Sequence, residues 1–501
     1  MKITVTTELI TSVATDCLIV TYCEDQDAVK GYTNRVDKAL DGRISQLISD
    51  KEVTGKLGEV TMLHNWGKIA SKRTLVVGLG KEEKLTIDKI RDAIGTAARY
   101  AAKKGITQVA FAVSNYYVER KFWNTVDAVQ AVVEGVELGS YSFPGYKKEN
   151  EKCCIEECIM IVKPEMERGA IDAGITRADV AATSTRLARD LVNEPGNLMT
   201  PEILAKKATE IAQNRNFEVT ILNKKDLEQL GMGALLGVGQ ASANEPKMIV
   251  LKYSGDPESK DILGFVGKGV TFDSGGIQVK PDEHMGDMKT DMAGAAAVLG
   301  AMDAIGELQP HVNVMAVIPT CENMIGANNL KPGDVISSFS GKTIEIVHTD
   351  AEGRLILADG ISYAKHLGAT KIIDVATLTG SVISALGHTT TGIMCNNRDL
   401  LEEVKTAARL SGEKVWELPN FEEYQEFIES KIADVKNDAG RPAGCIQGGV
   451  FLGAFAEDTP WVHMDIAGTA TTEKDNGHNP AGATGVAVRT LLQTALRFSG
   501  Q

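Results

Sequence analysis

Four acidic side chains in the middle of the chain have types and surroundings that suit metal chemistry: Asp273, Asp291, Asp350 and Glu352. The first lies in a run rich in glycine, residues 267–276, which lets the backbone approach a ligand closely. Carboxylate oxygens are the ligands that hard divalent cations prefer, and several such groups match a site for two metals. Helix caps and surface salt bridges explain most acidic residues in a protein of this size, so spacing alone leaves both interpretations open.

The segment His348–Leu355 concentrates charge without an apolar period. Its residues 348, 350 and 352 point the same way if the backbone is extended. Like charges held together are costly unless a cation compensates them, and Arg354 can balance only one of the two carboxylates. A bound metal ion would balance the rest.

Short β-branched runs that alternate with helical patterns are expected to position these residues. Predicted strands cover residues 74–77, 108–113, 158–162, 262–266 and 371–375, and predicted helices cover 87–102, 126–138, 168–192 and 355–367. The strand at 262–266 ends just before the glycine-rich run, and Asp291 precedes a helix of small residues at 292–300. This alternation predicts an α/β fold with loops at strand ends as the place for a site.

The chain of 501 residues is long enough for two large domains. A polar, turn-rich segment at 144–152 and the helix that starts near 168 place the predicted boundary at 165. We therefore expect a smaller α/β domain over 1–165 and a larger one over 166–501.

Composition limits the class of protein. Hydrophobic residues make up 43% and charged residues 24%, as in globular proteins, and the net charge of −14 argues against a nucleic-acid or anionic-membrane partner. No apolar stretch approaches the roughly 20 residues of a membrane span, and no secretory signal pattern is found. The eight cysteines, including Cys153, Cys154 and Cys158, form no disulfide or zinc framework. These features predict a cytoplasmic protein with reduced thiols.

Two long strings resemble the signatures of the cytosolic leucyl aminopeptidase family. They are Gly-Lys-Gly-Val-Thr-Phe-Asp-Ser-Gly-Gly at 267–276 and Thr-Asp-Ala-Glu-Gly-Arg-Leu at 349–355. Shorter similar strings lie at 188–195, 375–380 and 463–468, so that the resemblance spans about residues 165–490. It implies a macro-domain-like N-terminal domain and a catalytic domain with a central mixed sheet flanked by helices. The motifs of α/β-hydrolases (GxSxG) and of single-zinc peptidases (HExxH) do not occur.

The resemblance implies roles for seven polar residues. Lys268, Asp273, Asp291 and Glu352 would hold a tightly bound metal ion, and Asp273, Asp350 and Glu352 an exchangeable one. Lys268 must be neutral to act as a ligand, so its pKa should be lowered by the adjacent cations. Lys280 would stay protonated and stabilise the oxyanion, and Arg354 would hold bicarbonate or a similar base. His348 stands where the family commonly has asparagine, and a hydrogen-bonding loop histidine is expected there.

The implied activity is the release of N-terminal residues, preferably leucine or other apolar ones, from peptides with a free amine. The pocket for the first side chain would be lined by Met288, Thr377, Gly380, Ala467 and Ala470. Two divalent ions are expected in each subunit, Mn²⁺ or Zn²⁺ with Mg²⁺ and Co²⁺ as alternatives, and the subunits would form a homohexamer. A DNA-binding or regulatory hexamer on the same scaffold and a cysteinylglycine dipeptidase remain as alternatives.

Overall fold

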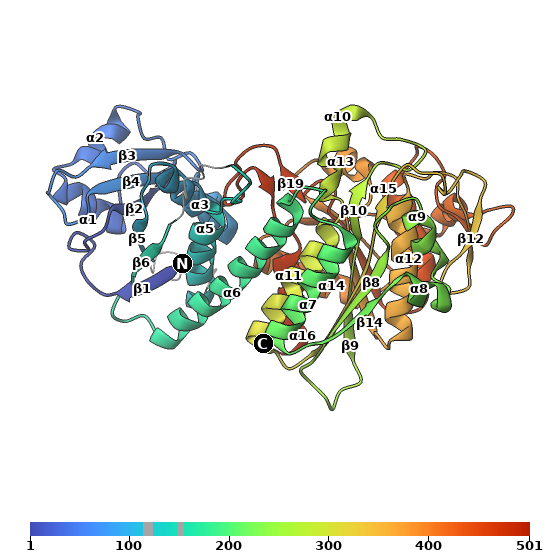
Figure 1. Cartoon of the computed structure of the whole chain (residues 1–501). Helices are drawn as coiled ribbons and strands as arrows, with labels where there is room; N and C mark the ends of the chain where they lie inside the picture. The colour runs from blue at the N-terminus through green and yellow to red at the C-terminus, as the bar shows by residue number, and fades with distance from the viewer. Residues whose placement is uncertain (114–123, 148–154, 501) are drawn as a thin grey trace. The chain divides into compact units, whose positions relative to one another are not determined.

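The chain folds into two compact units in the computed structural model, which describes residues 1–113, 124–147 and 155–500 (Figure 1). The N-terminal unit comprises Met1–Arg186 together with Thr472–Gly482, and the C-terminal unit comprises Leu187–Thr471 and Ala483–Gln501. Both units are α/β structures. They confirm the predicted two-domain α/β architecture.

The N-terminal unit is built on a six-stranded sheet with the order β1-β6-β5-β2-β4-β3. All neighbours are parallel except β3 and β4, which are antiparallel. The strands are β1 (Lys2–Thr6), β2 (Cys17–Tyr22), β3 (Val60–His64), β4 (Arg73–Gly78), β5 (Gln108–Ala112) and β6 (Glu157–Ile161). The helices are α1 (Gly31–Ala39), α2 (Arg43–Ser49), α3 (Ile87–Lys103), α5 (Thr125–Gly139) and the first part of α6 (Arg168–Asn193).

Alternate residues of β2 explain why helices cover both faces of this sheet. Cys17 and Ile19 belong to the core that includes residues of α3 and α5, whereas Leu18 and Val20 belong to a second core with residues of α1 and α2. Successive side chains of a strand point to opposite faces, so a strand that is apolar on both faces must be covered twice. The result is a three-layer α/β unit.

The C-terminal unit contains a mixed sheet of nine strands. Eight follow the order β16-β15-β18-β14-β9-β11-β8-β7, and β10 pairs with β11 beyond the end of β9. The central strands β18, β14, β9 and β11 are parallel to one another. The bounds are β7 (Glu218–Leu222), β8 (Lys247–Ser254), β9 (Ile262–Gly267), β10 (Gly269–Asp273), β11 (Asn313–Asn323), β14 (Lys371–Ala376), β15 (Thr391–Cys395), β16 (Val415–Glu417) and β18 (Trp461–Asp465).

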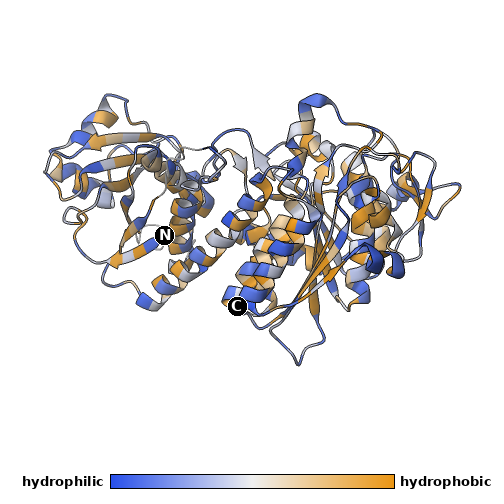
Figure 2. Cartoon of the chain, viewed as in Figure 1, coloured by the Kyte–Doolittle hydropathy of each residue, from blue (hydrophilic) through white to orange (hydrophobic). Residues whose placement is uncertain are grey.

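Helices cover both faces of this sheet as well. In Figure 1, α7 (Pro201–Arg215), α11 (Ala293–Leu308), α14 (Arg398–Ser411) and α16 (Val488–Phe498) lie on one face. The other face is covered by α8 (Lys224–Leu230), α9 (Gly233–Gly239), α12 (Glu352–His366) and α15 (Gly444–Ala456). The central strands are strongly hydrophobic between these layers (Figure 2). Smaller elements are α10 (Asp282–Met285), α13 (Gly380–Leu386), β12 (Val335–Ser337), β13 (Thr343–Glu345), β17 (Val435–Lys436), β19 (Thr471–Thr472) and β20 (Gly482–Ala483), with 3₁₀ turns at Glu82–Lys84, Gly286–Thr290 and Glu422–Ile428.

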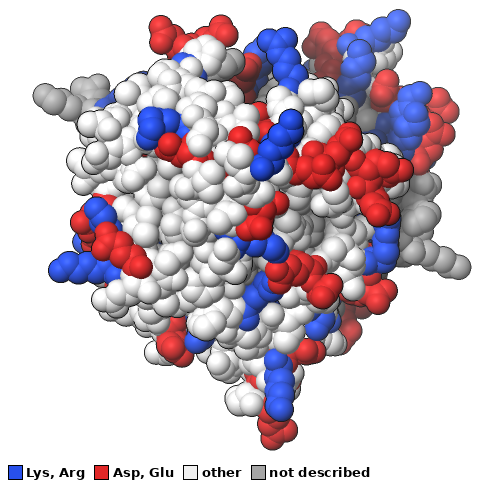
Figure 3. Space-filling view, turned by 90° about the vertical axis from the view of Figure 1, so that its right-hand side faces the viewer, with Lys and Arg blue, Asp and Glu red and all other residues white. Residues whose placement is uncertain are grey.

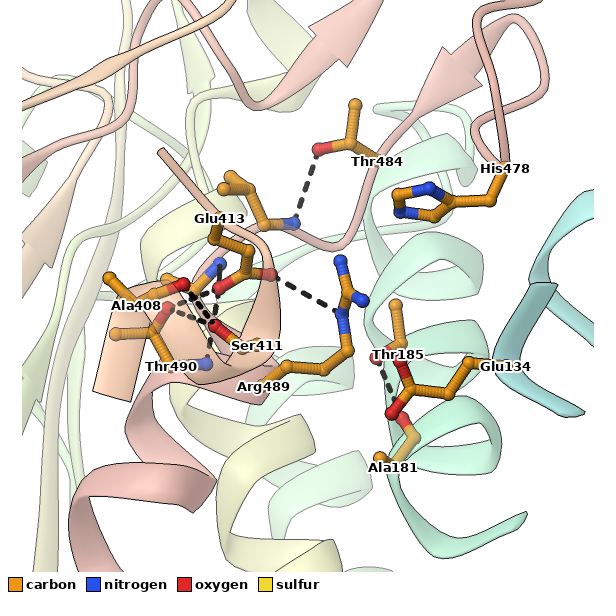
Figure 4. Close-up of polar contacts among 12 residues, drawn as sticks. Glu134, Ala181, Thr185, Ala408, Ser411, Glu413, His478, Thr484, Arg489 and Thr490 are labelled. Carbon is orange, nitrogen blue, oxygen red and sulfur yellow. Dashed lines mark hydrogen bonds and ion pairs between the residues drawn. The ribbon is translucent and has the colours of Figure 1, made fainter. Parts of the chain in front are cut away.

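A buried carboxylate fixes the C-terminal helix α16. Glu413 follows α14, and its Oε2 accepts hydrogen bonds from the backbone N–H groups of Ala487 and Thr490, each at 3.1 Å, and from the Thr490 hydroxyl at 2.5 Å (Figure 4). Its Oε1 lies 3.6 Å from Nε of Arg489. A carboxylate at a helix N-terminus satisfies free N–H groups and complements the helix dipole. Glu413 therefore caps α16 from a distant part of the chain.

The predicted elements agree closely with the structure at most positions, for example α3 at Ile87–Lys103 and β14 at Lys371–Ala376. The division between the two units, after Arg186, falls inside helix α6. The domain boundary at 165 stays a prediction. Cys158 is buried in β6, whereas Cys153 and Cys154 lie outside the described residues. Within the described ranges, no helix is both long and apolar enough to cross a membrane.

Candidate metal centre

A cavity of about 460 Å³ opens in the C-terminal unit at the carboxyl ends of the parallel strands. Ligands of open α/β sheets bind at this edge, because the loops that follow the strands meet there. The cavity is lined by Lys268, Asp273, Lys280, Pro281, Asp287, Met288, Thr290, Asp291, Asp350, Glu352, Thr377, Leu378, Thr379, Gly380, Ile383, Ala467, Ala470 and Thr471. Eleven of the twelve residues singled out in the sequence are therefore brought together around one space.

The four carboxylates reach this cavity from different elements. Asp273 ends β10, Asp291 follows the 3₁₀ turn at Gly286–Thr290, and Glu352 begins α12. Oxygen atoms of Asp273, Asp350 and Glu352 lie within 4.8 Å of one another. Buried oxygens Asp291 Oδ2 and Glu352 Oε2 accept no hydrogen bond from any part of the chain that the structure describes. Such unsatisfied acceptors fit a cation, which would supply the missing partner.

The backbone through residues 348, 350 and 352 is not extended, so the condition under which their side chains would point the same way is not met. Asp350 lies in a turn, and Glu352 occupies the first turn of α12. An acidic residue is favourable at that position because the helix dipole is positive there. His348 Nδ1 accepts a hydrogen bond of 3.2 Å from the backbone N–H of Asp350, so it shapes the turn, as expected of a loop histidine.

Lys268 lies among the carboxylates at the end of β9 and is 3% exposed. Its Nζ is 2.8 Å from Asp291 Oδ1 and 2.9 Å from Glu352 Oε1. Burial by itself would lower the pKa of Lys268, but these two carboxylates raise the pKa well above its ordinary value. The lowered pKa expected from the resemblance applies only with cations bound. Binding of a metal by Lys268 must therefore release its proton.

Lys280 bridges two carboxylates at the other side of the centre. Its Nζ lies 2.7 Å from Asp273 Oδ2 and 2.6 Å from Asp350 Oδ1. Burial opposes the charged form, yet the surrounding carboxylates, first of all Asp273, raise the pKa of Lys280 overall. Lys280 is thus held in its protonated form at the edge of the cavity.

The carboxylates themselves are electrostatically strained without a cation. Burial and repulsion from Asp273 and Glu352 raise the pKa of Asp350 to about 7. Burial likewise raises the pKa values of Asp273 and Asp291. Burial also opposes the charged form of Glu352, but Lys268 and Lys280 together outweigh it, so the pKa of Glu352 is lowered. Four carboxylates against two ammonium groups leave an excess of negative charge, which divalent cations would neutralise.

Glycine is required beside this centre at position 275. Gly275 has φ +87°, and a Cβ there would lie 2.7 Å from Asp350 Oδ1. Both the left-handed backbone and the contact exclude an ordinary side chain. The glycine-rich run thus allows Asp350 to approach Asp273.

Two residues are predicted to be catalytic, Lys280 and Arg354. Lys280 lines the cavity, whereas Arg354 is not among the described residues that line it. It lies in the first turn of α12, is 6% exposed, and its Nη1 donates a hydrogen bond of 2.6 Å to the carbonyl oxygen of Asn437. Burial lowers its pKa. Arg354 is close to the centre in sequence and lies beside it rather than within it.

The five residues expected in the substrate pocket all line the cavity: Met288, Thr377, Gly380, Ala467 and Ala470. The sequence interpretation missed Asp287, Ile383 and Thr471, which line the same space. It also missed Asp465, whose carboxylate accepts hydrogen bonds from Leu378 and Thr379 in the loop that follows β14. Ile383 lies one turn after Gly380 in α13, a spacing that could have revealed it.

The fold and this centre define a two-domain α/β protein with a buried cluster of carboxylates and lysines beside an apolar pocket. Comparison with known proteins identifies the class further. The description "Cytosol aminopeptidase family, catalytic domain" matches residues 186–492, and "Cytosol aminopeptidase family, N-terminal domain" matches residues 19–150. The chain belongs to the cytosol aminopeptidase family and is an aminopeptidase of that family.

Relatives match the chain over nearly its whole length. A probable cytosol aminopeptidase of Alkaliphilus metalliredigens (strain QYMF) is 45% identical, covering 99% of both chains. Among solved structures, a mutant of tomato leucine aminopeptidase has a TM-score of 0.88 and 34% identity, covering 99% of this chain and 96% of that one. The bottromycin maturation enzyme BotP in complex with Mn has a TM-score of 0.83 and 31% identity, covering 97% and 100%.

Proposed function

We propose that the protein is a two-metal aminopeptidase that removes leucine and similar apolar residues from the N-termini of peptides. The observation that carries this proposal is the group of buried carboxylates with unsatisfied oxygens beside a largely apolar cavity. A charged centre and an apolar pocket in one space can bind the amine and the first side chain of a peptide together. The similarity to tomato leucine aminopeptidase supports the preference for leucine.

The proposed metal ligands are Lys268, Asp273, Asp291, Asp350 and Glu352. Their oxygen-rich set accepts Mn²⁺, Zn²⁺, Mg²⁺ or Co²⁺, and the Mn complex of BotP favours Mn²⁺ as the first ion to test. When bound, two such ions supply Lewis acidity and an activated water at the scissile carbonyl. Among the described residues, the centre contains neither a cysteine nor a histidine ligand.

Lys280 and Arg354 are the proposed catalytic residues. Lys280 keeps its proton and lines the cavity, where its Nζ would donate a hydrogen bond to the oxyanion that forms from the substrate carbonyl. Arg354 keeps its positive charge beside Glu352, where it would hold bicarbonate or another small base that moves a proton. Because Arg354 donates Nη1 to Asn437, its remaining N–H groups are the ones available for this role.

The pocket for the first side chain is formed by small and apolar groups. Met288, Ala467 and Ala470 provide apolar surface, and Gly380 leaves space because nothing lies within 4 Å of the position of a Cβ there. Such a pocket fits leucine and methionine, and each methylene that it buries adds about 0.8 kcal/mol. We expect alanine and glycine to be poorer substrates.

We further propose that the chain assembles as a homohexamer in the cytoplasm. Exposed aromatic and aliphatic side chains of the C-terminal unit offer apolar surface for contacts between subunits, among them Trp416, Phe421 and Ile432, which are 66%, 61% and 62% exposed. The name of the relatives, cytosol aminopeptidase, supports this compartment. On the face shown in Figure 3, acidic side chains accompany the basic ones, which together with the charge of −14 disfavours a DNA-binding role.

The test is hydrolysis of leucine p-nitroanilide beside its N-acetylated form. The protein is stripped with a chelator and then supplied with Mn²⁺ or Zn²⁺. We expect cleavage of the free-amine compound only, and only after a metal is added, because an acetylated amine cannot bind a cation. Cleavage that survives the chelator, or equal cleavage of both compounds, would contradict the proposal.

A further inference from the structure

Asp465 connects the two loops that form one wall of the cavity. It ends β18 and is 1% exposed. Its Oδ1 accepts hydrogen bonds from the backbone N–H groups of Leu378 at 3.1 Å and Ala467 at 3.2 Å, and its Oδ2 accepts one from the Thr379 hydroxyl at 2.6 Å. A single buried carboxylate therefore binds the loop that follows β14 and the loop that follows β18.

The bond to Thr379 also determines where α13 begins. Thr379 is the N-cap of this helix, and its Oγ1 accepts a hydrogen bond of 3.2 Å from the backbone N–H of Val382. Because the hydroxyl donates to Asp465 and accepts from Val382, its orientation is fixed at both ends. Gly380 and Ile383 of α13 line the cavity, so their positions depend on Asp465.

The same loop is attached to the metal centre at its other end. The carbonyl oxygen of Thr377 accepts a hydrogen bond of 2.8 Å from Lys268 Nζ, and its hydroxyl donates one of 2.7 Å to Asp291 Oδ1. Residues 377–380 therefore extend from the centre to Asp465. The distance between the metal centre and the pocket wall is set by these two attachments.

A second buried group supports Asp465 from within the sheet. His463 Nδ1 lies 2.6 Å from Asp374 Oδ1, and Trp461 Nε1 donates a hydrogen bond of 2.6 Å to Asp374 Oδ2. All three residues are fully buried. Burial opposes the charged form of His463, but Asp374 raises its pKa overall, and the charge of His463 counters the rise that burial causes in the pKa of Asp465.

We propose that Asp465 is a positioning residue that fixes the pocket wall for the N-terminal side chain relative to the metal centre. The inference rests on the proposed aminopeptidase function. Without this carboxylate, no hydrogen bonds from one side chain connect the start of α13 to the loop at 466–470. A leucine side chain of the substrate then loses contacts with the pocket wall that the shorter alanine side chain does not make. The effect falls on KM and on selectivity, because binding contacts to a remote side chain are lost while the reacting groups stay.

The test compares Asp465→Ala with a matched control, Asp359→Ala. Asp359 is also fully buried and accepts hydrogen bonds from the backbone N–H groups of Leu235 and Phe339, but it does not line the cavity. Values of kcat and KM are measured for leucine and alanine p-nitroanilides, together with the Mn²⁺ bound per chain. Asp465→Ala is expected to lower the leucine-to-alanine ratio of kcat/KM about tenfold, mainly through KM for leucine, at unchanged Mn²⁺ content.

Two further variants complete the design. Asp465→Asn keeps one acceptor oxygen and should recover part of the selectivity, a rescue that loss of folding would not show. If Asp465→Ala does not fold, Thr379→Val replaces the hydroxyl that donates to Asp465 with a methyl group and should give the same direction of change, whereas Asp359→Ala should leave the ratio within about twofold.

The outcomes separate two failures. An active wild type with a leucine-to-alanine ratio that Asp465→Ala leaves within about twofold would overturn this inference alone, as would an unchanged ratio in Thr379→Val. A wild type that cleaves neither substrate with any metal would overturn the proposed function and this inference with it.

Discussion

Lys268 and Gly353 lie so close together that a Cβ on residue 353 would come within 2.5 Å of Lys268 Cε and 2.7 Å of its Nζ. Gly353 directly follows Glu352 in the first turn of α12. The missing side chain lets this turn pack on the lysine, and Glu352 can then approach Lys268 Nζ to 2.9 Å. The position of the lysine thus depends on a glycine that has no chemistry of its own.

Gly353→Ala should therefore disable the centre without altering any proposed ligand. The added methyl group must displace Lys268, and a shift of about 1 Å at a catalytic centre can cost about 100-fold in rate. We expect the Mn²⁺ affinity and kcat/KM to fall together by about that factor, measured by titration of the stripped protein. Gly169→Ala, in α6, is the control, because the nearest atom to its Cβ position is 3.9 Å away. Full activity in Gly353→Ala would show that Lys268 can move without consequence.

The buried carboxyl group of Asp359 should make the free energy of unfolding depend on pH. Burial raises its pKa from 3.8 to about 7 although two backbone N–H groups bind it. The folded state therefore holds a proton that the unfolded state releases above pH 4, so this group's stabilising contribution is complete below about pH 4 and is lost as the pH rises through about 7. The full difference corresponds to about 4 kcal/mol.

Asp359→Asn provides the measurement, because an amide does not titrate. Urea unfolding of the wild type and of Asp359→Asn is compared between pH 5 and pH 8. The variant should be less stable than the wild type at pH 5, since its NH₂ group faces a backbone N–H. The difference between their free energies of unfolding should become smaller as the pH rises. A difference in the free energy of unfolding that stays constant from pH 5 to pH 8 would mean that Asp359 is ionised throughout, and would contradict the raised pKa.

Much of the fold was predictable because local patterns and tertiary packing agree. The β-branched run of β14 lies between two parallel neighbours, and a strand buried in this way has an almost continuous apolar sequence. The helix that precedes it, α12, was predicted from residue 355, and it begins at Glu352. The sequence pattern did not reveal this N-terminus, because the alternation of His348, Asp350 and Glu352 also fits an extended chain.

The centre was predictable only in part. Asp273 and Glu352 belong to long strings with a clear resemblance to one family, so their joint presence at one cavity followed from it. Asp465 lies in one of the shorter similar strings, 463–468, but nothing in the sequence indicated its role, because its partners Leu378 and Thr379 are nearly 90 residues away and are brought to it by the pairing of β14 with β18. Contacts of this kind depend on tertiary structure and have no local period.

Glu413 should contribute measurably to stability as the cap of α16. Glu413→Gln removes the charge that three donors share at Oε2, and we expect a loss of about 1–3 kcal/mol in the free energy of unfolding. Glu402→Gln is the matched control: Glu402 is exposed and pairs with Lys405 at the surface, so the loss of its charge should cost less than about 0.5 kcal/mol. Equal thermal midpoints for the two variants would contradict the capping role.

Lys280 allows the proposed oxyanion role to be separated from metal binding. Its ammonium group lies between Asp273 and Asp350 and carries a raised pKa, so Lys280→Met removes a charge and a donor from the cavity edge. Loss of one oxyanion donor typically lowers kcat about 100- to 1,000-fold, and we expect a fall of this size with leucine p-nitroanilide.

Metal content decides how that fall is interpreted. Lys280 competes with cations for the oxygens of Asp273 and Asp350, so Lys280→Met should bind Mn²⁺ at least as well as the wild type. Lys280→Arg keeps the charge but presents a planar fork, and it should be intermediate in kcat. Lys331→Met is the control, since Lys331 pairs with Asp334 at the exposed surface. If kcat and bound Mn²⁺ fell in the same proportion, Lys280 would serve to assemble the centre, whereas a lower kcat at full metal content assigns it to the developing charge of the substrate.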